Sequence, residues 1–590
     1  MKPGTATWRP GWGWPYAGLT LLCVLAFWPA VNAGFSDFDD HGFLLETNHW
    51  RGLSPARLID IFTTMRLGHY QPLTYLTHAV EYTLFGLNPA VFHVTNILLH
   101  CLSACLVARI AARAIELWRP DTDATSRLHA GLIAAMLWAA HPLRAESVAW
   151  ITERRDVLSG ALLLGAVLAY LHLPNRRPYR WTLALLALSL LSKAWGMTFF
   201  AVALLLDVCP LRRLPLQFWR WTRAEYRPVL VEKLPMLALG AVFGFIAAKA
   251  VAEPSEDTVK TIADWGAVER ICQACYGLVF YVRKTLLPFN LAALYELPRA
   301  AGPSEPRFAL AIGLVCVAGA ALLWAAIKGT SRGVAIFIGF ALYAVVVSPV
   351  LGLTQAGIQL VADRYAYLST IPLFVLLAGA AIKSLDPSKK HHSTPLVGAL
   401  IVAMIASNLT RTYSERWSDT RALWEAAFAA GQDGPVLRNF YGRQLEKAKE
   451  FTKAEEAYRA SLAVVPEYGD SWFGLGNALR SQRRLDGAFA AYESAAGFMA
   501  DPVPAYVARG LMRVSDQSRP DLAVAEFAEA VRLTEERGNP SRTGGTYLLL
   551  AAAYGESGDD ARAVEWLKRA VEFDDTRERA AQHLRDLGVR

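Results

Sequence analysis

Long apolar segments recur along the first 410 residues and predict helices that cross a membrane. Most of them come close to the about 20 residues that an α-helix needs to span the hydrocarbon core. The pair between 180 and 211 is short for this task. The segments lie at 16–33, 89–110, 128–143, 157–173, 180–196, 197–211, 233–251, 307–327, 333–352, 366–383 and 394–409.

The polar C-terminal third carries a different pattern, a repeat of 34 residues. Gly442, Gly476 and Gly510 follow one another at this interval, as do two Ala-Tyr pairs, Ala454 with Tyr458 and Ala488 with Tyr492. Small residues at such positions let paired helices approach closely, and the aromatic residues fill the groove between them. The pattern resembles the tetratricopeptide repeat. It predicts an α-solenoid whose concave face binds a polypeptide, with a spacer or oligomerisation arm as the alternative.

Composition and charge agree with this division. Apolar residues make up 54% of the 590 residues and charged ones 19%, and the mean hydropathy is +0.24, which excludes a single soluble globule. Residues 1–410 carry a net charge of +11 and residues 411–590 a net charge of −3. No basic patch points to nucleic acid, and no nucleic acid partner is expected.

The placement of Lys and Arg predicts the orientation, because short loops rich in these residues face the cytoplasm. The count is consistent when region 268–292 is re-entrant or interfacial, and it then gives about eleven crossings with a cytoplasmic N-terminus. We expect an inner-membrane domain over 1–410, a linker over 411–435 and a periplasmic repeat domain over 436–590. Residues 34–88 would form the first outer loop, with helices lying in the membrane interface.

Ionisable residues gather at the outer face, where their burial is costly and a function is the default expectation. They are Asp39, Asp40 and His41 after the first span, His141 and Glu146 after the third, Arg154 and Arg155 in its continuation, Lys193 at the end of the fifth, and Arg364 and Tyr365 before the tenth. A carboxylate can take a proton from a hydroxyl or hold a metal ion, and guanidinium groups bind phosphate. The structural alternatives are a helix cap for Asp39 and Asp40, and pairing of Arg154 and Arg155 with Glu153 and Asp156.

Several motifs together resemble a known group of enzymes. They are Phe38-Asp39-Asp40-His41, Leu84-Phe85-Gly86-Leu87-Asn88-Pro89, His141-Pro142, Glu146-Ser147-Val148-Ala149-Trp150, Arg154-Arg155-Asp156, Ser192-Lys193 and Arg364-Tyr365-Ala366-Tyr367-Leu368. In this order, and followed by the repeats, they resemble the C-type glycosyltransferases, and among them the transmembrane and tetratricopeptide-repeat O-mannosyltransferases. The resemblance implies a polyprenyl-phosphate or dolichyl-phosphate sugar donor, transfer to a hydroxyl with inversion, and an essential Asp that corresponds to Asp39. Gln71, Ala194 and Asp363 depart from the residues usual in that family, and the first two bear on the donor site.

The leading hypothesis is an all-α protein that moves a sugar, mannose in the first instance, from a polyprenyl-phosphate to a hydroxyl acceptor such as protein Ser or Thr. Asp39 would be the base and Asp40 its assistant or, with Asp39, the ligand of a divalent metal ion. Arg154, Arg155, Lys193 and Arg364 would bind the donor phosphate, with His41, His141, Glu146 and Tyr365 as further pocket residues. The alternatives are a membrane-anchored scaffold without catalysis, and an O-antigen-ligase-like enzyme or lipid transporter.

Overall fold

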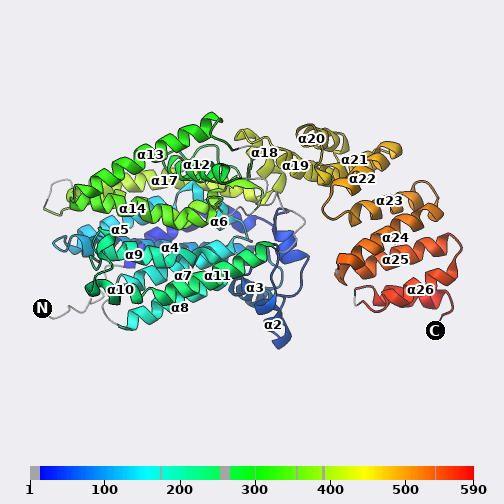
Figure 1. The fold of residues 1–590 in the computed structure, drawn as a ribbon, viewed down its shortest axis with the longest axis horizontal. Coiled ribbons are helices and arrows are strands. Elements are labelled where there is room, and N and C mark those ends of the chain that lie inside the picture. Colours follow the sequence, from blue (N-terminus) through cyan, green and yellow to red (C-terminus); the bar gives the residue numbers. More distant parts are fainter. Residues whose placement is uncertain are drawn as a thin grey trace. The chain divides into compact units, whose positions relative to one another are not determined.

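The computed structural model describes residues 13–172, 176–252, 266–298, 301–353, 357–388, 393–537, 540–573 and 575–589. Nearly all regular structure in these residues is helical, which confirms the all-α class. The chain divides into two compact units, Met1–Gly431 and Gln432–Arg590, coloured blue to yellow-green and yellow to red in Figure 1. Each unit is described by itself below.

The first unit is a bundle of helices. Several of them begin at a polar cap followed by Pro, as α4 does, where the Asn88 side chain accepts a hydrogen bond from the N–H of Ala90 and Pro89 takes the first helical position. The helices are α1 (Gly13–Phe27), α2 (Pro55–Thr63), α3 (Pro72–Phe85), α4 (Pro89–Trp118), α5 (Ala124–Ala139), α6 (Ala145–Ala149), α7 (Arg154–Tyr170), α8 (Arg176–Ser192), α9 (Phe199–Val208), α10 (Arg227–Val231), α11 (Leu234–Ala252), α12 (Ala267–Leu286), α13 (Pro306–Ile327), α14 (Ser331–Val347), α15 (Ala366–Ser369), α16 (Ile371–Ala381), α17 (Thr394–Glu415) and α18 (Thr420–Ala429).

Among the described residues, five helices are long and apolar enough to cross a membrane, or seven if each of two bent pairs counts as one span. The five are Gly13–Asn32, Pro89–Trp118, Pro306–Ile327, Ser331–Val350 and Thr394–Ser418. The chain is therefore a multi-pass membrane protein. The expected total of eleven crossings stays a prediction, because α5, α7 and α8 have only 16 or 17 residues each.

Two regions that the sequence predicts to be a re-entrant or interfacial segment and a linker are helical. Region 268–292 holds α12, which buries Gly277, Phe280 and Tyr281, while Val268 and Ile271 near its start are more than half exposed. Residues 411–431, expected as part of a linker, complete α17 and form α18, and they belong to the first unit.

Residues 34–88, which the sequence predicts to be the first outer loop, contain α2 and α3 at the expected places. Helix α2 buries Ile61 and exposes Ile59 and Phe62, so it has one apolar face without a partner in the described structure. It protrudes from the helical bundle in Figure 1. Its position in a membrane interface stays a prediction.

A small sheet lies next to Arg364, one of the ionisable residues that the sequence predicts at the outer face. Strands β1 (Tyr295–Glu296) and β2 (Gln359–Val361) are antiparallel, with Tyr295 opposite Val361. The hydroxyl of Tyr295 donates a hydrogen bond to Asp363 (3.0 Å), just beyond β2. The sheet thereby fixes the chain that carries Arg364.

The second unit is a series of antiparallel helix pairs, as the 34-residue period predicts (Figure 1). A Cβ placed on Gly476 would lie 2.6 Å from the ring of Tyr492, and one on Gly442 would lie 2.7 Å from Tyr458, so glycine is needed where each pair meets. The helices are α19 (Pro435–Lys447), α20 (Phe451–Val464), α21 (Gly469–Ser481), α22 (Leu485–Phe498), α23 (Val503–Ser515), α24 (Pro520–Arg537), α25 (Pro540–Glu556), α26 (Asp560–Ala570) and α27 (Arg577–Asp586).

Candidate active site

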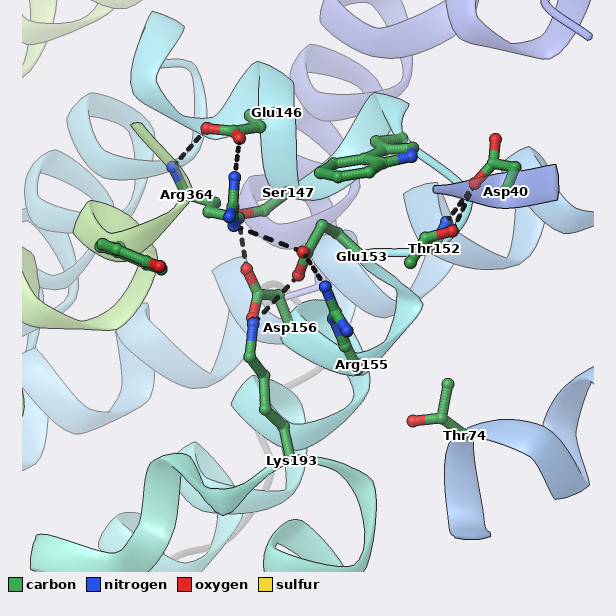
Figure 2. Close-up of polar contacts among 12 residues, drawn as sticks. Asp40, Thr74, Glu146, Ser147, Thr152, Glu153, Arg155, Asp156, Lys193 and Arg364 are labelled. Atoms are coloured by element: carbon green, nitrogen blue, oxygen red, sulfur yellow. Dashed lines mark hydrogen bonds and ion pairs between the residues drawn. The ribbon is translucent and has the colours of Figure 1, made fainter. Parts of the chain in front are cut away.

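Asp40 ties the segment after α1 to the chain before α7. One oxygen of its buried carboxylate accepts a hydrogen bond from the N–H of Ser36 (2.7 Å), and the other accepts from the N–H and the hydroxyl of Thr152 (3.0 and 2.5 Å). Figure 2 shows the contact with Thr152. Both oxygens are thus engaged, and Asp40 is placed to position the loop.

Asp39 is in a different situation, although it is the next residue. Its side chain keeps partial solvent exposure, and no hydrogen bond or ion pair to its carboxylate is found among the described residues. Burial raises the pKa of Asp39 to about 6, and the nearby charges of Arg155 and Arg364 limit this rise. At neutral pH the group is a largely ionised carboxylate with room to accept a proton.

Glu153 lies at the centre of a group of charged side chains that we call the ion cluster: Glu146, Glu153, Arg155, Asp156, Lys193 and Arg364. Fully buried, Glu153 contacts all three cations, with distances of 2.7 Å to Arg155 Nη2, 3.0 Å to Lys193 Nζ and 3.4 Å to Arg364 Nε. Burial raises its pKa, but these three cations outweigh that effect and hold the pKa well below its usual range. Glu153 therefore stays ionised and draws the cations together (Figure 2).

The other two carboxylates of the ion cluster, Asp156 and Glu146, bind its cations and neighbouring donors. Asp156 accepts hydrogen bonds from Lys193 Nζ (2.5 Å), the indole of Trp195 (2.8 Å) and the hydroxyl of Ser147 (3.1 Å). Glu146 accepts from the backbone N–H of Arg364 (2.8 Å) and pairs with its guanidinium. These contacts hold the chain around Glu146–Asp156, Lys193–Trp195 and Arg364 together at the ion cluster.

Arg155 is the cation with unused donors. Its Nη2 contacts Glu153, whereas Nε and Nη1 are buried without a hydrogen-bond partner in the described structure, and the side chain is only 3% exposed. The guanidinium lies over the ring of Phe43, 5.2 Å from its centroid. Buried donors without acceptors are costly, so a bound anion would complete this arrangement.

The metal ion considered for Asp39 and Asp40 does not fit the geometry. The oxygens of Asp40 already accept three hydrogen bonds from Ser36 and Thr152. In the described part of the chain, no three His, Cys, Asp or Glu side chains converge in a way that could hold a metal ion.

Arg154 points away from the ion cluster, in contrast to its expected role at the phosphate. It is fully buried and pairs with Glu81 (3.0 Å), while its remaining donors reach the carbonyl of Phe92 (2.7 Å), the side chain of Asn96 and the hydroxyl of Thr77 (3.3 Å). All three guanidinium nitrogens are used. Arg154 fastens the start of α7 to α3 and α4.

The remaining pocket candidates make local contacts. His141 caps a short 3₁₀-helix (Pro142–Arg144) and contacts the carbonyl of Thr285 (3.0 Å), so it is a structural residue. His41 pairs with Asp37 (2.7 Å) and is nearly half exposed. Tyr365 accepts a hydrogen bond from Gln359 (2.7 Å) and lies beside the guanidinium of Arg364, 5.1 Å from the ring centroid.

The sequence interpretation had treated Glu153 and Asp156 only as pairing partners of the arginines. His69 is a further residue near these charges: burial and the charges of Arg155 and Lys193 lower its pKa well below the usual value, so its imidazole is neutral. The four consecutive charges from Glu153 to Asp156 beside an apolar span were the available signal for the first two residues.

An aromatic stack borders the site. The ring of Trp150 is stacked between Phe38 (5.0 Å between centroids) and Trp417 (5.1 Å). The guanidinium of Arg364 also lies over Trp150, at 5.6 Å. The stack fixes Phe38 and with it the backbone of Asp39.

An apolar groove of about 430 Å³ lies beside the ion cluster and runs between α4, α7, α9, α14 and α16. Trp195, which donates to Asp156, lines one end together with Thr198 and Leu368. Arg119, Arg332 and Lys383 are the charged residues among those described as lining the groove. The groove is suited to a long apolar chain whose polar end lies at the ion cluster.

Comparison with known proteins identifies the C-terminal repeats directly. Family models described as tetratricopeptide repeat match residues 441–502 and 545–577. The repeat predicted from the sequence is thereby confirmed.

The relatives that match this chain over a part or most of its length include protein O-mannosyl-transferases. Protein O-mannosyl-transferase TMTC3 of Mus musculus is 22% identical over 522 residues, which cover 83% of this chain and 55% of the relative. Protein O-mannosyl-transferase Tmtc3 of Drosophila melanogaster is 30% identical over 173 residues, covering 26% of this chain and 18% of the relative. The chain thus spans about half the length, or less, of these relatives.

Among solved structures, ArnT from Cupriavidus metallidurans bound to undecaprenyl phosphate covers 86% of this chain and 81% of its own, with 16% identity and a TM-score of 0.35. The resemblance stated from the motifs is confirmed by the named relatives and the repeat matches: this chain is similar to protein O-mannosyl-transferases and carries tetratricopeptide repeats.

Proposed function

We propose that this protein is an inverting glycosyltransferase that moves a sugar, mannose in the first instance, from a polyprenyl-phosphate carrier to a hydroxyl of a polypeptide. The observation that carries the proposal is the unengaged carboxylate of Asp39 next to Arg155, whose two buried N–H groups lack acceptors. A base and an incomplete anion site side by side are what transfer from a sugar phosphate to a hydroxyl requires. The names of the relatives support the sugar.

The reaction uses the two groups in one step. Asp39 accepts the proton of the acceptor hydroxyl while the hydroxyl oxygen forms a bond to the anomeric carbon of the sugar. The bond between that carbon and the phosphate oxygen breaks, and its electron pair leaves on the carrier phosphate. Attack from the face opposite the leaving phosphate inverts the anomeric centre, and the N–H groups of Arg155 stabilise the charge that the phosphate gains.

Lys193 and Arg364 would assist Arg155 at the phosphate. Both are held against Glu153, which keeps the three cations together despite their mutual repulsion. Before the donor binds, the carboxylates of the ion cluster balance this positive charge. Arg154 has no part in this step, since its donors are used elsewhere.

The apolar groove supports a lipid carrier for the sugar. Its lining is almost entirely apolar, and it starts at Trp195 beside the ion cluster. The first prenyl units of the carrier would lie there, with the phosphate at Arg155.

We further propose that the site and the repeats face the periplasm, as the distribution of Lys and Arg predicts, and that the repeats bind the acceptor polypeptide. In this proposal the membrane domain, expected over 1–410, extends to residue 431, since α18 packs Trp424 into the first unit.

The test is Asp39→Asn in the full-length protein. The change keeps the shape of the side chain and removes the proton acceptor, so transfer of labelled mannose from a polyprenyl-phosphate to a Ser/Thr-containing acceptor should fall by roughly 10²-fold or more. Binding of the donor should stay nearly unchanged. Asp37→Asn, two residues away and paired with His41, is the matched control and should retain transfer.

Near-normal transfer by Asp39→Asn would overturn the assignment of the base. Donor binding without transfer in the wild-type protein, across sugars and acceptors, would favour the scaffold or lipid-transporter alternatives.

A further inference from the structure

The end of the apolar groove that is remote from the ion cluster is lined by three cations, Arg119, Arg332 and Lys383. We propose that it binds an anionic phospholipid of the opposite leaflet, with the lipid phosphate at Arg119, Arg332 and Lys383 and one acyl chain in the groove. This site goes beyond the proposed transfer reaction and does not depend on it.

The three cations lie at the same end of the groove. Two of the cations are carried by α14 and by the segment after α16, and these two helices pack against each other. A Cβ on Gly339 of α14 would meet the side chain of Leu376 of α16. Arg332 precedes Gly339 by seven residues and Lys383 follows Leu376 by seven, so in antiparallel helices each is about 10 Å from this contact in the same direction.

The course of the chain gives the direction. Helix α16 follows Arg364 of the ion cluster, and α14 leads to β2 just before Asp363, so α16 runs away from the cluster and α14 runs toward it. Arg119 follows α4, whose Arg113 donates to the carbonyl of Leu171 (3.2 Å) at the end of α7. Since α7 begins in the ion cluster, Arg119 also lies at the remote end.

The charged residues described as lining this end of the groove are all cations. Three cations from three separate segments line it, and no Asp or Glu is among the described lining residues. The guanidinium of Arg119 lies over the ring of Trp118, which also lines the groove, at 4.7 Å from its centroid. Basic pockets between membrane helices are known to suit anionic lipid headgroups, because phosphate pairs with the cations while the chains stay apolar.

The length of the groove leaves room for two lipids. From Ile371 to Lys383 it follows twelve residues, about 18 Å in helical rise, and it continues past a 50° bend to Leu368, whereas half of the hydrocarbon core is about 15 Å thick. A chain anchored at the remote cations would fill the far part of the groove. The part beside Trp195 stays open for the sugar carrier.

The experiment measures lipid binding to the purified full-length protein without any sugar donor. Dioleoyl phosphatidylglycerol and dioleoyl phosphatidylcholine are titrated in detergent, with native mass spectrometry and thermal unfolding as readouts. We expect at least tenfold tighter binding of phosphatidylglycerol, and its reduction to the level of phosphatidylcholine in Arg119→Gln/Arg332→Gln. Arg332→Gln alone, a change of an exposed side chain, should lose part of the preference and serves if the double variant does not fold.

Two controls define the contrary results. Arg223→Gln/Arg227→Gln removes two exposed cations outside the groove lining and should keep the preference. Equal binding of the two lipids by wild type, or an equal loss in this control, would overturn the site. Inorganic phosphate is the third ligand: if it stabilises the protein as much as phosphatidylglycerol does, the cations bind a free anion and the lipid proposal is wrong.

Discussion

Two buried groups in the first unit hold carboxylates against cations, and they differ in one respect. Around Asp207 at the end of α9, the carboxylate accepts from the hydroxyl of Tyr170 (2.7 Å), from Lys233 (2.7 Å) and from Arg213 (3.2 Å). No buried polar side-chain atom of these four residues lacks a partner in the described structure. In the ion cluster, Arg155 keeps two such atoms.

The difference separates a structural group from a candidate site. A closed set of contacts gains nothing from a ligand, whereas an open one is completed by a ligand that supplies acceptors. Burial and charge alone would not distinguish the two, since Asp207 and Glu153 are both fully buried. The unmatched donors of Arg155 and the unengaged carboxylate of Asp39 carry the distinction.

The largest expected effect comes from a substitution in the group around Asp207, in which every buried polar side-chain atom has a partner among the described residues. Asp207→Asn removes the nearer of the two counter-charges of the buried Lys233 and leaves only Glu232, 3.6 Å away, which should lower stability by about 3 to 5 kcal/mol. Thermal unfolding in detergent measures this loss. Protein that remains folded should bind the sugar donor with unchanged affinity, because the group lies outside the site. Glu225→Gln, an exposed residue only 3.9 Å from Arg223, should leave the unfolding temperature unchanged.

The second largest effect is expected from a substitution in the ion cluster, in which Arg155 has unmatched donors. Arg155→Gln removes the two donors proposed to receive the leaving phosphate, so kcat should fall by about 10² to 10³-fold, as for the loss of one donor to a developing anion. The unfolding temperature should change little, since unsatisfied N–H groups are removed with the charge. Arg213→Gln is the counterpart and should show the reverse, a lower unfolding temperature with normal kcat in the folded fraction. A stability loss in Arg155→Gln as large as in Arg213→Gln would contradict the contrast.

These residues also show how far the sequence leads. The repeats were predictable because each unit is local, and the 34-residue period places Gly476 against Tyr492 within one helix pair. Counting spans also predicts that Asp39, Arg155, Lys193 and Arg364 lie on one face of the membrane, and this stays a prediction. The structure then adds the contacts that bring the three cations to Glu153.

The sequence could not choose between neighbours. Arg154 and Arg155 begin the same helix, and consecutive helical residues point about 100° apart, so one faces α3 and α4 while the other faces the ion cluster. Asp39 and Asp40 diverge for a similar reason, since Asp40 is engaged by Thr152, which lies 112 residues away in sequence. Such choices depend on contacts between distant segments.

A pH series sharpens the role of Asp39. With a pKa of about 6, the base is lost as the pH falls, so kcat/KM should be half-maximal near pH 6 and decrease about tenfold per unit below it. Stability should change in the opposite sense. Because this pKa lies above the ordinary 3.8, ionised Asp39 costs stability above pH 6, and the cost disappears as the pH falls to about 4.

Asp39→Asn should therefore unfold at a higher temperature than wild type at pH 7.5, and this gain should vanish between pH 6 and pH 4. Asp37→Asn serves as the control and should show no such gain. A constant difference at all pH values would mean that the carboxylate is not desolvated in the folded protein.

The smallest expected effect is on the stability of the repeat unit. It tests whether the contact between α21 and α22 leaves no space for an added methyl group. In Gly476→Ala the new Cβ would lie 2.6 Å from the ring of Tyr492, so the helices α21 and α22 must separate, at a cost of about 1 to 3 kcal/mol. Gly497→Ala in α22 is the matched control: its Cβ meets no atom within 4 Å, and alanine favours the helix by up to about 1 kcal/mol. Thermal unfolding of the repeat unit should therefore shift down in the first variant and up in the second. Transfer to a small acceptor that bypasses the repeats should be the same in both, and a parallel loss of that transfer in Gly476→Ala would show that the repeats support the membrane site.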